Sequence, residues 1–149
     1  MVDSSILERY SLFGGLDRDQ INRVVALMEQ EFHKASSVII TEGKQNDKIR
    51  FILDGKVAVV KGGIILAEFN EGALFGEMEV LDIMPAEASV RAVIDTSTLS
   101  LSGAALREIY NTDIKAYALM LMNLARDISR RLRRMDNMVT QESPFMEWN

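Results

Sequence analysis

The chain has 149 residues, of which 48% are hydrophobic and 26% are charged, and its formal net charge at pH 7 is −5. This length fits one domain, and the acidic balance argues against sequence-independent binding of nucleic acid, which depends on lysine and arginine neutralising phosphates. The chain contains no cysteine, so disulfides, thiolate metal sites and thiol nucleophiles are excluded.

Helices are predicted over residues 4–30. A serine can cap a short first helix over residues 4–10. Asp17 and Gln20 have the spacing of a capping box, which predicts the start of a second, stronger helix. Apolar residues then recur at helical period: Ile21, Val24, Val25 and Met28.

A glycine-punctuated region over residues 31–101 predicts a β-roll. Its short apolar runs are separated by turn signals about every 8–12 residues, a pattern typical of a sandwich or a jelly-roll barrel. The predicted strands are 31–34, 38–40, 50–53, 56–60, 64–67, 89–93 and 98–101.

One run inside this β region consists of good helix formers. Residues 77–81 predict a short helical turn between strands, which Pro85 then ends. Such a turn can aim the unpaired backbone N–H groups of its first residues at an anion. Gly76 would let the backbone come close to a ligand, and the Glu77 carboxylate can accept hydrogen bonds from hydroxyl groups.

Two helices are predicted over residues 103–137, followed by a disordered tail over residues 138–149. Ser102 can cap the first helix, and Asn111 or Thr112 can cap the second. The tail shows no periodicity, which is why we expect it to be disordered.

The long helix, over residues 113–137, carries apolar residues that step by three and four for about three heptads, enough to pair two helices. They are Ile114, Tyr117, Ala118, Leu121, Leu124, Ala125, Ile128, Leu132 and Met135. The other faces carry arginines that are most simply a solvated surface. Arg131 differs, because it lies three residues after Ile128, at the edge of the apolar seam, where it could lean over a pocket.

The residues Phe75-Gly76-Glu77-Met78, a spacer ending at Pro85, and then Ala88-Ser89-Val90-Arg91-Ala92 resemble the phosphate-binding cassette of the cyclic nucleotide-binding domain family. The spacing fits that pattern without a gap. We call residues 74–92 the cassette. The resemblance extends from about Leu12 to Arg134, although only the cassette is specific.

The resemblance implies a role for each cassette residue. In the family, the glutamate after the glycine binds the ribose 2′-hydroxyl and the next positions present backbone amides. Gly76, Glu77 and Met78 keep these parts, and Ser89 keeps the small hydroxyl side chain common at its position. The arginine that normally follows the proline and pairs with the cyclic phosphate is replaced by Ala86. Deleting one side of a desolvated charge pair costs on the order of 2–5 kcal/mol, so we expect weak binding of cyclic AMP or cyclic GMP.

The cassette also has an excess of carboxylates. Glu87 replaces a small or hydroxylated family residue, and Glu79 stands where the family usually has a small apolar one. With Glu77 and Asp82 nearby, these charges repel a phosphate. The same four carboxylates could form a general acid/base pair or a divalent-cation site, but exposed loop charge is the simpler interpretation.

Three basic residues have alternative interpretations. Arg131 could touch a base or partly replace the missing phosphate partner, so it joins the predicted ligand-binding set. His33, the only histidine, is most simply structural, because jelly-roll metal enzymes hold their metal with several histidines. Arg91 shares strand parity with Ser89, but the family often has a basic residue there that it does not use on phosphate.

From the strand pattern and the resemblance we predict an α+β fold in one domain over residues 1–137. It is an eight-stranded antiparallel jelly-roll, or double-stranded β-helix, with N-terminal helices and a long C-terminal helix. The resemblance implies a stand-alone regulatory or sensor domain that binds a cyclic nucleotide. It would signal through the 113–137 helix, which also forms a homodimer, to an unknown downstream protein.

The alternative is a ligand-free homodimeric interaction or scaffold module that has lost nucleotide binding. Ala86 and Glu87 favour this alternative, and the retained Gly76-Glu77 argues against it. An enzyme is not expected, because no convincing nucleophile–base pair is present. We also expect no DNA-binding domain after the long helix, no membrane segment and a cytoplasmic protein, since neither a signal peptide nor a membrane helix is evident.

Overall fold

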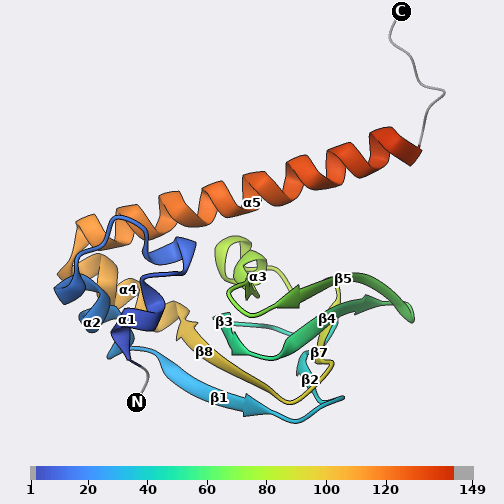
Figure 1. The fold of residues 1–149 in the computed structure, drawn as a ribbon, viewed down its shortest axis with the longest axis horizontal. Helices are drawn as coiled ribbons and strands as arrows, with labels where there is room; N and C mark the ends of the chain where they lie inside the picture. The colour runs from blue at the N-terminus through green and yellow to red at the C-terminus, as the bar shows by residue number, and fades with distance from the viewer. Residues whose placement is uncertain (1–2, 143–149) are drawn as a thin grey trace, which may run out of the picture.

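Two four-stranded antiparallel sheets form a roll with helices at one end and along one side (Figure 1). The structure, a computed structural model, describes residues 3–142, with side chains described to residue 139. One sheet has the strand order β1-β8-β3-β6 and the other β2-β7-β4-β5. The predicted eight-stranded jelly-roll with flanking helices is confirmed.

All seven predicted strands are present, together with an eighth that the pattern missed. The strands are β1 (Glu29–His33), β2 (Val38–Ile40), β3 (Lys48–Asp54), β4 (Lys56–Lys61), β5 (Ile64–Asn70), β6 (Leu74–Phe75), β7 (Ser89–Ala92) and β8 (Thr96–Ser102). The missed strand, β6, has only two residues, which is too short for any periodicity. It pairs with β3 in the register Arg50↔Phe75, so the start of the cassette is fixed to the edge of a sheet.

The helices are α1 (Ser4–Leu7), a 3₁₀ turn η1 (Ser11–Phe13), α2 (Arg18–Val25), α3 (Glu77–Asp82), α4 (Gly103–Thr112) and α5 (Ile114–Glu142). The predicted capping box is confirmed, since Asp17 and Gln20 each bond the backbone N–H of the other. The first helix is shorter than the predicted 4–10, and Asp3 caps it, not a serine. The second helix ends at Val25, and the chain is already in β1 by Glu29.

The C-terminal helices begin with one expected cap and one unexpected cap. Ser102 accepts a hydrogen bond from the N–H of Ala105, as predicted. The cap of α5 is Asp113, whose Oδ1 accepts from the N–H of Ala116 at 3.1 Å, so the prediction of Asn111 or Thr112 is wrong. No helix in the described part of the chain is both long enough and apolar enough to cross a membrane.

Helix α5 extends past its predicted end at residue 137 and reaches Glu142. The predicted disordered tail is therefore wrong over residues 138–142, which continue the helix. The rest of that prediction, over residues 143–149, lies outside the described residues.

The core has two parts because successive side chains of β3 point to opposite faces of its sheet. Ile49 and Phe51 pack with the helices in the larger apolar cluster. Ile52 packs with Val57 and Val90 of the facing sheet in the smaller cluster. The side chains of Arg50 and Ile52 lie on the same face of β3, because they are two residues apart. The charged side chain of Arg50 therefore points between the two sheets.

Candidate ligand-binding site

The cassette begins with a glycine that the local geometry requires. Gly76 has φ 82, a left-handed conformation, and immediately precedes α3. A Cβ at this position would lie 2.8 Å from the carbonyl oxygen of Lys48 and 2.9 Å from Nδ2 of Asn46. Only glycine combines this backbone conformation with so close an approach. The first turn of α3 is therefore held against the start of β3.

Glu77 and Arg131 form an ion pair between the cassette and α5. The buried Glu77 carboxylate lies 2.7 Å from Nη1 of Arg131, a residue 54 positions further along the chain. Arg131 also donates to the carbonyl oxygen of Leu74, and its guanidinium lies 4.7 Å from the ring centroid of Phe69. The carboxylate that the resemblance assigns to the ribose hydroxyl is thus already engaged by the long helix (Figure 1 shows α5 passing over α3).

The guanidinium of Arg131 contacts a second carboxylate besides that of Glu77. Asp127, one turn before Arg131 on α5, lies 3.2 Å from its Nη2. Burial raises the pKa of Glu77, while the Arg131 charge opposes that rise and the charges of Glu79 and Asp127 add to it. The site therefore keeps a negative balance even with Arg131 in place.

Glu79 places a second carboxylate on the first turn of α3. Burial raises the pKa of Glu79, and the neighbouring charges of Asp82 and Glu87 raise it further. Hydrogen bonds from its own backbone N–H and from the Asn46 side chain act in the opposite direction. The chain therefore places a carboxylate of its own on the turn that the resemblance assigns to a phosphate.

The position of the missing arginine is buried against a turn. Ala86 donates its N–H to the carbonyl oxygen of Lys44 at 2.9 Å and accepts from the N–H of Gly43 at 2.7 Å. Nearby, the hydroxyl of Ser89 accepts from the N–H of Glu42 at 2.9 Å. Backbone pairing fixes this segment without any contribution from an arginine or a ligand.

The predicted site residues fall into three groups. Gly76, Glu77 and Arg131 come together at the junction of α3 and α5. Ala86 and Ser89 line up along the turn at residues 42–44, as described above. Side chains of the remaining two point to solvent: Met78 and Glu87 are both exposed.

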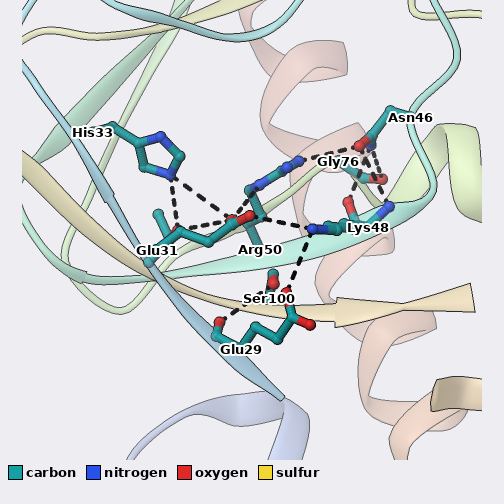
Figure 2. Close-up of polar contacts among 9 residues, drawn as sticks. Glu29, Glu31, His33, Asn46, Lys48, Arg50, Gly76 and Ser100 are labelled. Carbon is teal, nitrogen blue, oxygen red and sulfur yellow. Dashed lines mark hydrogen bonds and ion pairs between the residues drawn. The ribbon is translucent and has the colours of Figure 1, made fainter. Parts of the chain in front are cut away.

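Sequence reasoning missed the polar network beneath Gly76 (Figure 2). Asn46 donates to the carbonyl oxygen of Gly76 at 3.0 Å, and Arg50 donates to Asn46 at 3.1 Å. Arg50 in turn donates to Glu31 of β1 at 2.9 Å. The sequence did contain one signal for this network: Arg50 is a charged residue in a strand, between the apolar residues Ile49 and Phe51.

His33 lies at the far end of the same network. Its Nε2 is 3.0 Å from the hydroxyl of Thr98 and 3.8 Å from Glu31. Burial lowers the pKa of His33, which favours the neutral ring. Within the part of the chain that the structure describes, no group of three or more acidic or histidine side chains is arranged to hold a metal ion.

Comparisons with known proteins find similar sequences and similar folds. The sequence profile of the cyclic nucleotide-binding domain family matches residues 30–113. The cyclic AMP receptor protein of Thermus thermophilus is 32% identical over 130 residues, covering 84% of this chain. The regulatory subunit of the cAMP-dependent protein kinase of Yarrowia lipolytica is 28% identical over 98 residues, covering 66% of this chain.

Among solved structures, a cyclic nucleotide-binding domain from Methylobacillus flagellatus KT has a TM-score of 0.82 and 26% identity, and the match covers 97% of this chain and 83% of that one. The curated relatives are longer proteins. The chain spans 58% of the length of the Thermus receptor and 26% of the Yarrowia regulatory subunit.

Glu79→Gln is expected to stabilise the protein at neutral pH and to flatten the dependence of its Tm on pH. The pKa of Glu79 is raised in the folded state, so its stabilising effect is present at low pH and is lost as the pH rises through the folded-state pKa. Thermal unfolding from about pH 4 to about pH 8 would measure this loss. Glu108→Gln, at an exposed carboxylate on α4, is the control. Equal pH slopes for Glu79→Gln and the parent chain would contradict the assignment.

Proposed function

The chain belongs to the cyclic nucleotide-binding domain family, and from this premise we propose that it is a regulatory domain whose cassette takes up a ligand and whose helix α5 reports the event. The observation that carries the proposal is the ion pair of Glu77 and Arg131. It joins the residue assigned to the ligand directly to the helix assigned to signalling.

A ligand at the cassette would act on that ion pair. A hydroxyl that donates to Glu77 shares the carboxylate with Arg131, so binding changes the balance of forces that holds α5. The first half of α5 is anchored, because Ala116, Met120 and Leu124 are buried against the rest of the chain. The part of α5 beyond Arg131 exposes its apolar residues. Arg131 therefore lies where a small change at the cassette can alter the direction of this last part of α5.

The ligand class that we propose is a cyclic nucleotide, cyclic AMP or cyclic GMP, bound weakly. Gly76 and Glu77 supply the turn and the ribose acceptor, and the hydroxyl hydrogen of Ser89 can be donated to an anion. The chain offers no arginine at Ala86, and Glu79 competes for the turn. Two of the relatives described above are named for cyclic AMP, which supports this ligand class.

We further propose that α5 forms a homodimer. Seven-residue spacing places apolar residues along one face of the helix: Ile114, Ala118, Leu121, Ala125, Ile128, Leu132, Met135 and Val139. Most of this face is exposed, while Met120 and Leu124 pack on the chain's own core. A heptad seam that the chain itself does not cover is suited to pairing with the same helix of a second copy.

The alternative function, a ligand-free interaction module, is favoured by the exposed face of α3. Ile83 follows this helix with φ 58 and is 78% exposed. A β-branched residue in the left-handed region costs about 1–2 kcal/mol, so a strained isoleucine in solvent points to a use other than stability. Met78, Leu81 and Met84 are exposed beside it, and a partner protein would cover such a patch.

Calorimetric titration with cyclic AMP and cyclic GMP separates the two functions. The double substitution Ala86→Arg with Glu87→Ser restores the counter-charge, and we expect an affinity gain between about 30-fold and several thousand-fold. Glu87→Ser alone is the matched control, since it removes the carboxylate without adding the arginine.

Weak but measurable heat from the parent chain and a large gain in the double variant would support the sensor. No heat from either protein at millimolar ligand would contradict it and leave the interaction module.

Leu132→Glu is expected to abolish the homodimer in light scattering. Burying one leucine stabilises an interface by about 1.5–3 kcal/mol, and a symmetric dimer loses two, which weakens association by at least about 100-fold. Arg133→Glu, the control, introduces a glutamate at the next residue, outside the seam, and should leave the dimer intact. Equal loss of dimer in both variants would contradict pairing along this seam.

A further inference from the structure

The carbonyl group of Gly76 is held by a side chain from outside the cassette. Asn46, in the loop before β3, directs its Nδ2 to the carbonyl oxygens of Gly76 at 3.0 Å and of Lys48 at 3.1 Å. Its Oδ1 accepts from the N–H of Lys48 at 3.3 Å and from Nη1 of Arg50 at 3.1 Å. Both ends of the amide are thus engaged, so its orientation is fixed (Figure 2).

The support for Asn46 continues into the sheet. Arg50 is buried, and its Nε lies 2.9 Å from Oε1 of Glu31 on β1. Lys48 lies 3.3 Å from the other oxygen of the same carboxylate. A buried guanidinium is stable only with partners that satisfy its charge and its donors, and here Glu31 and Asn46 supply them. The network therefore runs from β1 through Arg50 and Asn46 to Gly76.

This network affects the direction of a backbone N–H group at the start of α3, that of Glu77. The carbonyl of Gly76 and the N–H of Glu77 belong to the same planar trans peptide group and point in opposite directions. A hydrogen bond that fixes the carbonyl oxygen on the β3 side therefore fixes the N–H on the side away from β3. Gly76 itself has the left-handed conformation, with φ 82 and ψ 6.

We propose that Asn46 is a positioning residue for the cassette, and that Arg50 and Glu31 hold it in place. Asn46 sets the orientation of the Gly76–Glu77 peptide group that a ligand would meet. The ligand side of this inference rests on the proposed function, whereas the orientation of the peptide group is a property of the free protein.

The test uses the full chain and compares two asparagines. Asn46→Ala removes the bond to Gly76. Asn123→Ala is the matched control, because Asn123 also donates to two backbone carbonyl oxygens, those of Leu12 at 2.9 Å and Gly14 at 2.8 Å, but far from the cassette. Asn46→Asp keeps the size and the acceptor towards Arg50, replaces the two donors by an acceptor and adds a negative charge.

The first readout is backbone amide exchange and NMR chemical shift at Glu77 and Met78 in the free protein, measured relative to the Ile52 amide in β3. We expect both Asn46 variants to accelerate relative exchange at Glu77 and Met78 by about tenfold and to move their shifts, as the loss of one buried hydrogen bond would. Asn123→Ala should leave the relative exchange unchanged. Unchanged exchange and shifts in both Asn46 variants, or the same change in Asn123→Ala, would overturn the proposal.

The second readout is titration of Ala86→Arg with Glu87→Ser, with and without Asn46→Ala, using cyclic AMP. Asn46→Ala adds no charge, so loss of most of the regained affinity would support a role for Asn46 towards the ligand, and full retention would contradict it. If no heat appears even without the Asn46 change, the proposed function fails, and the exchange data alone still decide whether Asn46 positions the peptide group.

Discussion

A carboxylate and a guanidinium from distant parts of the chain meet beside the cassette, and the arrangement around them follows from that contact. Glu77 is almost fully buried, and Arg131 is its partner at 2.7 Å. A buried carboxylate without a partner destabilises the fold. Separating α3 from α5 would therefore leave the charge of Glu77 or that of Arg131 either exposed to solvent or buried without its partner. The cation–π contact with Phe69 and the bond to Leu74 add the strand β5 and the start of the cassette to the same junction.

Charge then decides what the cassette can hold. The resemblance implies a pocket that offers a phosphate an arginine and free amides, whereas this chain has Ala86 at the corresponding position and the Glu79 carboxylate on the first turn of α3. The negative balance disfavours anions, and the exposed, strained Ile83 offers a partner protein an apolar surface instead. The sensor and the interaction module thus share one scaffold, and they differ in whether the turn at Gly76 meets a ligand.

Much of the fold could be predicted from the sequence, because glycine turns, capping residues and the heptad of α5 are local signals. The strand β6 could not be found, since two residues carry no period. The cassette and its missing arginine were also visible in the sequence. The partners of its side chains were not, because Arg131 reaches Glu77 across 54 residues and Asn46 reaches Gly76 across 30. Contacts of this kind depend on how the strands and helices pack in three dimensions. Their traces in the sequence were the charged Arg50 between Ile49 and Phe51, and the place of Arg131 at the edge of the apolar seam.

A double-mutant cycle of Glu77→Gln and Arg131→Met, measured by urea unfolding, tests the central contact most directly. Arg131→Met leaves the buried Glu77 carboxylate without its cation and is expected to lower the free energy of unfolding by about 3–5 kcal/mol. Glu77→Gln is expected to cost less, because Arg131 keeps its contacts with Asp127 and Leu74. The double substitution should cost less than the sum of the two, with a coupling of about 2 kcal/mol or more. Additive effects of the two substitutions would contradict the account, because they would mean that the cassette and α5 are held together by other contacts.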